Sequence, residues 1–64
     1  MHLLSMIDRY LKRSGTPPTR FGRDVLGDPN FVRELRRGRQ PHIRTERRVA
    51  EWLRHEDAAR KAAQ

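Results

Sequence analysis

The sequence predicts an all-α domain, and three observations support this fold class. Apolar residues recur at helical spacing in four segments, Gly and Pro residues separate these segments, and no segment has the pattern of a strand. With 64 residues and no cysteine, the chain is near the lower size limit for a single core without disulfides. We therefore expect residues 1–64 to form one compact four-helix domain.

The helices are expected over these ranges: 2–13, 18–26, 29–37 and 46–61. In the first, a face of leucine and isoleucine opposes a charged face, and Gly15 supplies the left-handed conformation with which helices often end. The second begins after Thr16-Pro17, because proline is tolerated in a first turn, where N–H groups have no intrahelical partner. Phe21 and Val25, four residues apart, give it a buried stripe.

The third helix has the clearest start signal in the chain. Asp28 can accept hydrogen bonds from the free N–H groups of a first turn, and Pro29 fixes φ there without the loss of a needed donor. Val32 and Leu35 are the expected buried residues, and Gly38 ends the helix.

The fourth helix follows a connector, residues 39–44, in which Ile43 is the apolar anchor. Thr45 is the expected N-cap. Three apolar side chains share one face of the helix: Val49, Trp52 and Leu53. Residues 55–64 are helix-prone with little apolar bulk, which predicts either a frayed end or a surface for another chain.

The positive charge is concentrated and consists mainly of arginine. Thirteen of the 15 basic residues are Arg, whose planar guanidinium matches phosphate oxygens and the guanine edge. Residues 33–48 hold seven Arg against two Glu, which is +5 of the net charge of +7. This density indicates a nucleic-acid partner, and a solvated basic surface is the alternative.

Several functions lack the residues that they need. Without cysteine, with scattered histidines and without a carboxylate cluster, no metal site is expected. No serine has a base near it in the pattern and no glycine-rich loop cradles phosphate, so we expect neither catalysis nor a cofactor or small-molecule ligand. No stretch approaches the roughly 20 apolar residues of a membrane span, and no signal peptide is present, so a cytoplasmic, nucleoid-associated protein is expected.

Two short helices separated by two or three residues, the second of them basic, have the arrangement of a helix-turn-helix. The ungapped run from Phe21 to Arg39 resembles this motif in lambda-repressor-like (Cro-type or XRE) transcriptional regulators, with Gly22 where the family has a small residue. With the first helix and the turn before Thr45, the resemblance covers residues 3–54. It implies sequence-specific binding of double-stranded DNA, with helix 29–37 in the major groove.

The sequence also departs from the family pattern. Leu26-Gly27 stands where many members have glycine followed by an apolar residue, and Pro17 stands where a Ser or Thr cap is common. Pro29 replaces a side chain that often reads a base, so base reading is expected to move to Asn30 and Arg33. The family's usual fifth helix has no counterpart.

Under this interpretation, Arg33 pairs with a guanine, or else with a phosphate. Asn30 pairs with an adenine edge or a phosphate, or makes a helix-start hydrogen bond. Phe31 contacts a thymine methyl or lies in the core, and Glu34 accepts from cytosine, pairs within its helix or repels wrong sequences. The expected phosphate-binding residues are Thr16, Thr19, Arg20, Arg36, Arg37, Arg39, Arg44 and Arg47.

A domain of this size reads only a few base pairs, so we expect a homodimer on a palindromic or repeated site. The expected interface residues are Trp52, Leu53, Ala59 and Ala63, although the spacing of Trp52 from Val49 also suits the core. We interpret the regulator as a repressor, because the chain leaves no room for a ligand-binding or polymerase-contacting domain. Two alternatives stay open: an architectural protein that coats DNA by charge, and a membrane-binding or partner-binding module suggested by the amphipathic residues 2–13.

Overall fold

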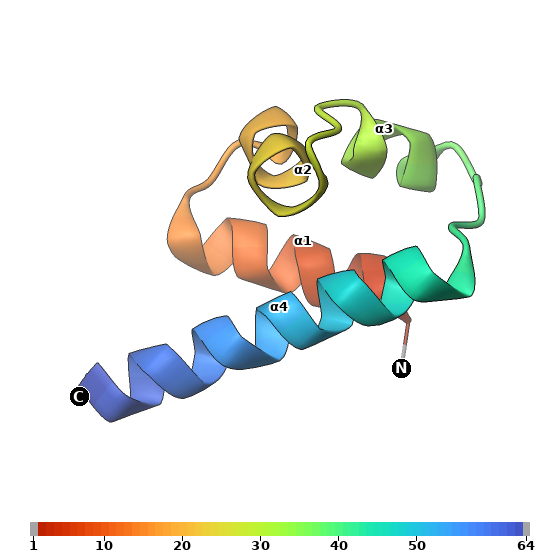
Figure 1. Cartoon of the computed structure of the whole chain (residues 1–64). Helices are drawn as coiled ribbons and strands as arrows, with labels where there is room; N and C mark the ends of the chain where they lie inside the picture. The colour runs from red at the N-terminus through yellow and green to blue at the C-terminus, as the bar shows by residue number, and fades with distance from the viewer. Residues whose placement is uncertain (1, 64) are drawn as a thin grey trace.

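The computed structural model describes residues 2–63, with side chains as far as Ala59. Its elements are α1 (Leu3–Ser14), α2 (Pro18–Leu26), α3 (Phe31–Arg36) and α4 (Ile43–Ala63), with no strand in residues 2–63. The prediction of an all-α fold with four helices is therefore confirmed. α1 and α4 lie side by side and run in similar directions, while α2 and α3 cover them and the last turns of α4 extend beyond the other helices (Figure 1).

The core takes residues from all four helices. Its buried members are Leu3, Ile7, Leu11, Phe21, Val25, Phe31, Val32, Val49 and Leu53. The apolar face of α1 is used here, which leaves no free apolar stripe on that helix for a membrane. None of the helices in the described part of the chain combines the length and apolar character that crossing a bilayer requires.

Three aromatic rings join α1, α2 and α4. The ring of Tyr10 lies 5.7 Å from that of Phe21 and 5.3 Å from that of Trp52, and the rings of Phe21 and Trp52 are 5.5 Å apart. Both contacts of Trp52 are edge-to-face, an arrangement that contributes about 0.5–1.5 kcal/mol per pair beyond the buried area. The partly buried Trp52 thus packs against the core, as its spacing from Val49 predicts.

The connector from α2 to α3 folds back tightly onto α2. Gly27, at φ 70°, donates its N–H to the carbonyl of Arg23 at 2.9 Å, and the N–H of Asp28 reaches the carbonyl of Gly22 at 3.1 Å. The carbonyl of Asp28 then lies directly over Gly22, where an added Cβ would be only 2.2 Å from the oxygen. Glycine at this position therefore permits the close approach that brings Phe31 against α2.

α3 begins at Phe31 and ends at Arg36, so its predicted range of 29–37 was too long at both ends. Asp28 does accept a hydrogen bond, from the N–H of Asn30 at 3.0 Å, but this bond closes a turn before the helix. The carbonyl of Asp28 also accepts from the N–H of Phe31 at 3.2 Å. Asp28 therefore accepts a hydrogen bond as predicted, but the bond forms a turn over residues 29 and 30, which the prediction assigned to the helix.

α4 begins at Ile43, three residues before its predicted start, and Thr45 lies inside the helix instead of capping it. His42 takes the capping position, because its Nδ1 accepts from the N–H of Arg44 at 3.1 Å and its carbonyl accepts from the N–H of Glu46 at 2.9 Å. Ile43 is 52% exposed, so its predicted role as an apolar anchor was wrong. The helix continues to Ala63, so the backbone of the predicted tail is helical up to that residue.

Candidate functional site

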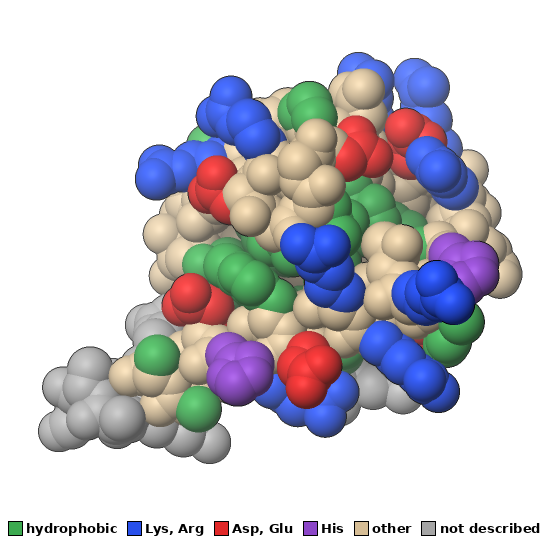
Figure 2. Space-filling model, in the orientation of Figure 1, with side chains coloured by type: hydrophobic (Ala, Val, Ile, Leu, Met, Phe, Trp, Pro, Cys, Tyr) green, Lys and Arg blue, Asp and Glu red, His purple; other side chains and the backbone are tan. Residues whose placement is uncertain are grey.

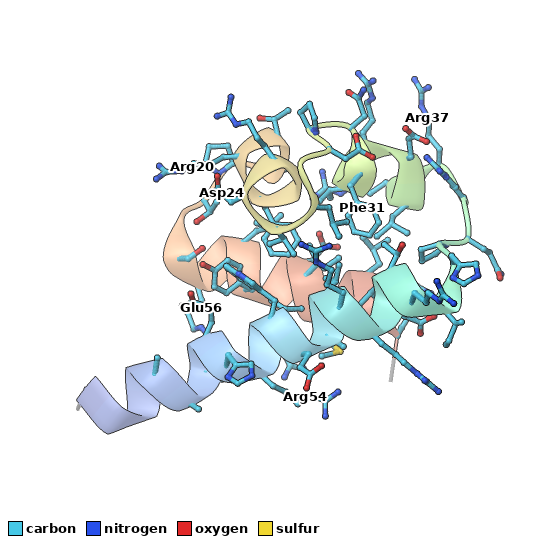
Figure 3. The ribbon with its side chains drawn as sticks, in the orientation of Figure 1. Arg20, Asp24, Phe31, Arg37, Arg54 and Glu56 are labelled. Atoms are coloured by element: carbon cyan, nitrogen blue, oxygen red, sulfur yellow. The ribbon has the colours of Figure 1, made fainter. Side chains whose placement is uncertain are left out.

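The outer surface of α3 and of the turn before it carries polar and basic side chains. Phe31 and Val32 point into the core, so Asn30, Arg33 and Arg37 are left exposed. Arg37 projects away from the body of the molecule at its upper edge (Figure 3). The structure therefore brings the two residues predicted to read bases, Asn30 and Arg33, onto one exposed surface.

Asn30 and Arg33 contact each other directly. The Nη2 of Arg33 donates a hydrogen bond to the Oδ1 of Asn30 at 2.8 Å, one helical turn away. Asn30 makes no side-chain hydrogen bond to the start of α3, although it occupies the N-cap position. The predicted alternative, a hydrogen bond from the Asn30 side chain to the first turn of the helix, is thus not observed.

Glu34 and Arg39 link α3 to the connector that follows it. Their side chains form an ion pair, and the N–H of Arg39 donates to the carbonyl of Glu34 at 3.0 Å. The carboxylate of Glu34 therefore already has a cationic partner, and this partner lies outside the helix, whereas a pair within the helix was one of the three predicted roles. A base or a phosphate would have to compete with this pair.

Phe31 belongs to the core and does not reach a base. Its side chain is only 6% exposed and packs among the other buried residues. Contact with a thymine methyl, one of its two predicted roles, is therefore excluded for this conformation, and the alternative of a core position is confirmed. The sequence signal was its spacing of four residues from Leu35, which is partly buried on the same side.

Two more of the predicted phosphate-binding arginines, besides Arg39, hold a carboxylate of the same chain. The Nη2 of Arg36 lies 3.0 Å from the Oδ1 of Asp8, so this pair joins α3 to α1. The Nε of Arg20 lies 3.5 Å from the Oδ2 of Asp24, one turn along α2. All four side chains are roughly half exposed or more, and such pairs contribute about 0–1 kcal/mol.

The start of α2 leaves N–H groups available. Pro17 is the N-cap residue and provides no side-chain hydrogen bond, so the first turn, which includes the exposed Thr19, has no side-chain cap. Thr16 lies just before it and its hydroxyl oxygen accepts from the hydroxyl of Ser14 at 2.9 Å. An anion beside this turn would meet unsatisfied donors and the positive end of the helix dipole.

A second basic cluster lies on the first turns of α4. Arg44, Arg47 and Arg48 are exposed and line a shallow groove that reaches Asp24 on α2. Within the part of the chain that the structure describes, these three arginines form no ion pair with a carboxylate, and neither does Arg37. Arg48 received no individual role from the sequence, although its spacing of four residues from Arg44 would have placed both on one side of the helix.

The basic residues on the face shown in Figure 2 are scattered and do not form one stripe. Figure 2 shows Lys and Arg side chains along the upper edge, across the middle of this face and at its lower edge. Arg54 lies on α4 at the edge opposite Arg37 (Figure 3). The chain reverses direction at the connector after Gly38, so charges that are close in the sequence are spread around the surface.

The predicted dimer interface needs correction. Leu53 is 5% exposed and belongs to the core of its own chain, so it is not available to a partner. Trp52 is partly buried against Tyr10 and Phe21. Ala59 is exposed, and the side chain of Ala63 lies outside the described residues. The apolar face of α4 is used internally because it packs against α1 and α2.

No protein-family model matches this sequence, and comparison with curated proteins and with solved structures finds no match either. The chain's function is therefore inferred from its own residues and their arrangement.

Proposed function

We propose that the chain is a sequence-specific double-stranded DNA-binding regulator of transcription, of the lambda-repressor-like helix-turn-helix class, acting as a repressor in the cytoplasm. The observation that carries this proposal is the exposed pair of Asn30, the N-cap residue of α3, and Arg33, one turn into α3, on a helix that packs against α2 through a tight connector. α3 enters the major groove, and α2 crosses the DNA backbone beside it.

The dimensions of α3 suit this role. A helix with its side chains is about 10–12 Å across, and the B-DNA major groove, about 12 Å wide, admits one such helix. α3 lies at the edge of the molecule with its outer side uncovered (Figure 1). Buried Phe31 and Val32 hold its inner side, so the exposed side chains are carried on a fixed support.

Phosphate contacts come from both sides of α3. Arg20 and the uncapped first turn of α2 lie before it, and Arg37, Arg44 and Arg47 follow it. Each arginine that replaces a condensed cation on the DNA contributes affinity that falls with salt and does not depend on sequence. These residues position the protein, while Arg33 supplies the choice of sequence.

Binding as a homodimer on a palindromic or repeated site follows from size, because α3 alone reaches only a few base pairs. With Leu53 in the core, the partner surface shifts to the part of α4 around exposed Ala59, which extends beyond the other helices.

A sequence-tolerant architectural DNA-binding protein is the second candidate. The distribution of arginine favours it, because Arg54 and Arg37 lie on opposite edges and would let one molecule contact two DNA segments. Such a protein would bind all duplexes through charge alone.

Selection of bound sequences from a random duplex pool, followed by a salt series on selected and scrambled duplexes, separates the two candidates. A regulator keeps a preference on the order of a thousandfold or more as salt rises. Equal loss of binding for all duplexes would support the architectural protein and contradict the regulator.

A further inference from the structure

We infer that Asn30 is a positioning residue that orients Arg33 toward a guanine, and that it does not read an adenine of its own. This inference rests on the proposed function, since it assigns the base class that α3 recognises. Every binding site selected by the protein is then expected to contain a guanine that depends on both side chains.

Three hydrogen bonds fix Asn30. Its N–H donates to the Oδ1 of Asp28 at 3.0 Å, and its carbonyl accepts from the N–H of Glu34 at 3.0 Å. Its side-chain Oδ1 accepts from the Nη2 of Arg33 at 2.8 Å. The amide is thus attached to a fixed backbone, and the guanidinium of Arg33 is held by that amide.

The chemistry of the contact favours guanine over adenine. An asparagine that reads adenine accepts from the N6 amino group through Oδ1 and donates to N7, and here Arg33 already occupies one of the two lone pairs of that Oδ1. The guanidinium has five N–H donors, so four remain after this contact. Guanine presents two acceptors, O6 and N7, to those donors, whereas the N6 amino group of adenine would face a cation that can only donate.

The side chain of Asn30 is uncharged, so it orients Arg33 without offsetting the positive charge of the guanidinium. Other arginines of the site, such as Arg36 and Arg39, are held by carboxylates, which offset their charge. Arg33 is oriented by an amide and keeps its full attraction for DNA. Its direction is set before binding, so less side-chain freedom is lost when it meets the base.

The test compares Asn30→Ala and Asn30→Asp with the unmodified chain on the selected duplex and on duplexes in which each base pair is replaced in turn. In the unmodified chain, replacing the guanine should weaken binding by about 5- to 150-fold, the range for one bidentate contact. Asn30→Ala should reduce severalfold the guanine ratio, which is the affinity for the selected duplex divided by the affinity for the duplex in which the guanine is replaced. Asn30→Asp should keep the ratio, because a carboxylate also holds Arg33, while its charge weakens binding to every duplex.

Arg54→Ala is the matched control, since it removes a charge at the opposite edge and should leave the ratio unchanged. If Asn30→Ala keeps the guanine ratio and loses discrimination at an adenine, the inference is wrong and the proposed function stands. A selected site that contains no guanine would likewise show that the inference is wrong while the proposed function stands. If the unmodified chain prefers no duplex over another, the proposed function fails together with the inference. Circular dichroism of each variant should show a folded chain, because Asn30 is exposed.

Discussion

Replacing Gly22 with Ala tests the contact that sets α3 against α2. The new Cβ would lie 2.2 Å from the carbonyl oxygen of Asp28, and 3.3 Å from the Cβ of Phe31. The oxygen cannot move freely, because it accepts from the N–H of Phe31 at 3.2 Å, and the N–H of Asp28 is bound to Gly22 at 3.1 Å. Relief of the overlap therefore requires the connector to move away from α2.

The expected cost follows from these contacts. Loss of the two hydrogen bonds costs about 1–3 kcal/mol at about 0.5–1.5 kcal/mol each. The displaced packing of Phe31 adds about 1–3 kcal/mol. The higher helix propensity of alanine returns about 1 kcal/mol. We therefore expect Gly22→Ala to lower the free energy of unfolding by about 1–5 kcal/mol, and each kcal/mol corresponds to roughly 4–8 °C in Tm for a domain of this size.

Thermal and urea denaturation, followed by circular dichroism and by the fluorescence of Trp52, measure this change. The control is Gly15→Ala, which has the left-handed φ of 73° but no atom within 4 Å of the added Cβ. It should cost about 1–2 kcal/mol from backbone conformation alone. A Gly22→Ala variant as stable as the unmodified chain, or more stable, would refute the close approach of the connector to α2.

Three further predictions concern DNA binding and the core. Arg33→Ala should weaken binding to the selected duplex by about 1–3 kcal/mol and relax sequence choice, whereas Arg54→Ala should not change sequence choice. Fluorescence anisotropy with selected and scrambled duplexes measures both variants. Equal effects of the two variants on sequence choice would argue against base reading by Arg33. Arg44→Ala should weaken binding to all duplexes alike and lower the slope of log K against log salt by about one; a loss confined to the selected duplex would contradict a phosphate role. Trp52→Ala should reduce stability by about 3 kcal/mol or more by circular dichroism, and a loss below about 1 kcal/mol would show that the aromatic contacts with α1 and α2 contribute little.

The helices that the sequence predicts best are those with local end signals. The predicted range of α1 differs from the observed one by one residue at each end, and the predicted range of α2 matches the observed one. These bounds were predictable because Gly15, Pro18 and Gly27 each act on the backbone beside them. The predicted start of α4 was wrong because the ring nitrogen of His42, and not the hydroxyl of Thr45, accepts a hydrogen bond from the first turn of the helix.

The candidate site was predictable only where it depends on one helix. A spacing of three residues places Asn30 and Arg33 on one side of α3, and the structure adds that they bond to each other. The pair between Arg36 and Asp8 joins residues 28 apart in the sequence, so no periodicity could indicate it. Burial of Leu53 likewise depends on which helices cover α4, a choice made by the tertiary fold.

The internal ion pairs affect how the salt dependence of binding should be interpreted. A phosphate that binds Arg20, Arg36 or Arg39 competes with a carboxylate of the same chain for the charge of the guanidinium. A carboxylate that loses its arginine in this way attracts a cation from solution, which offsets the cation released from the DNA. Under the proposed function, the slope of log K against log salt should therefore count arginines without such a partner, such as Arg37, Arg44 and Arg47, and should understate the total number of phosphate contacts.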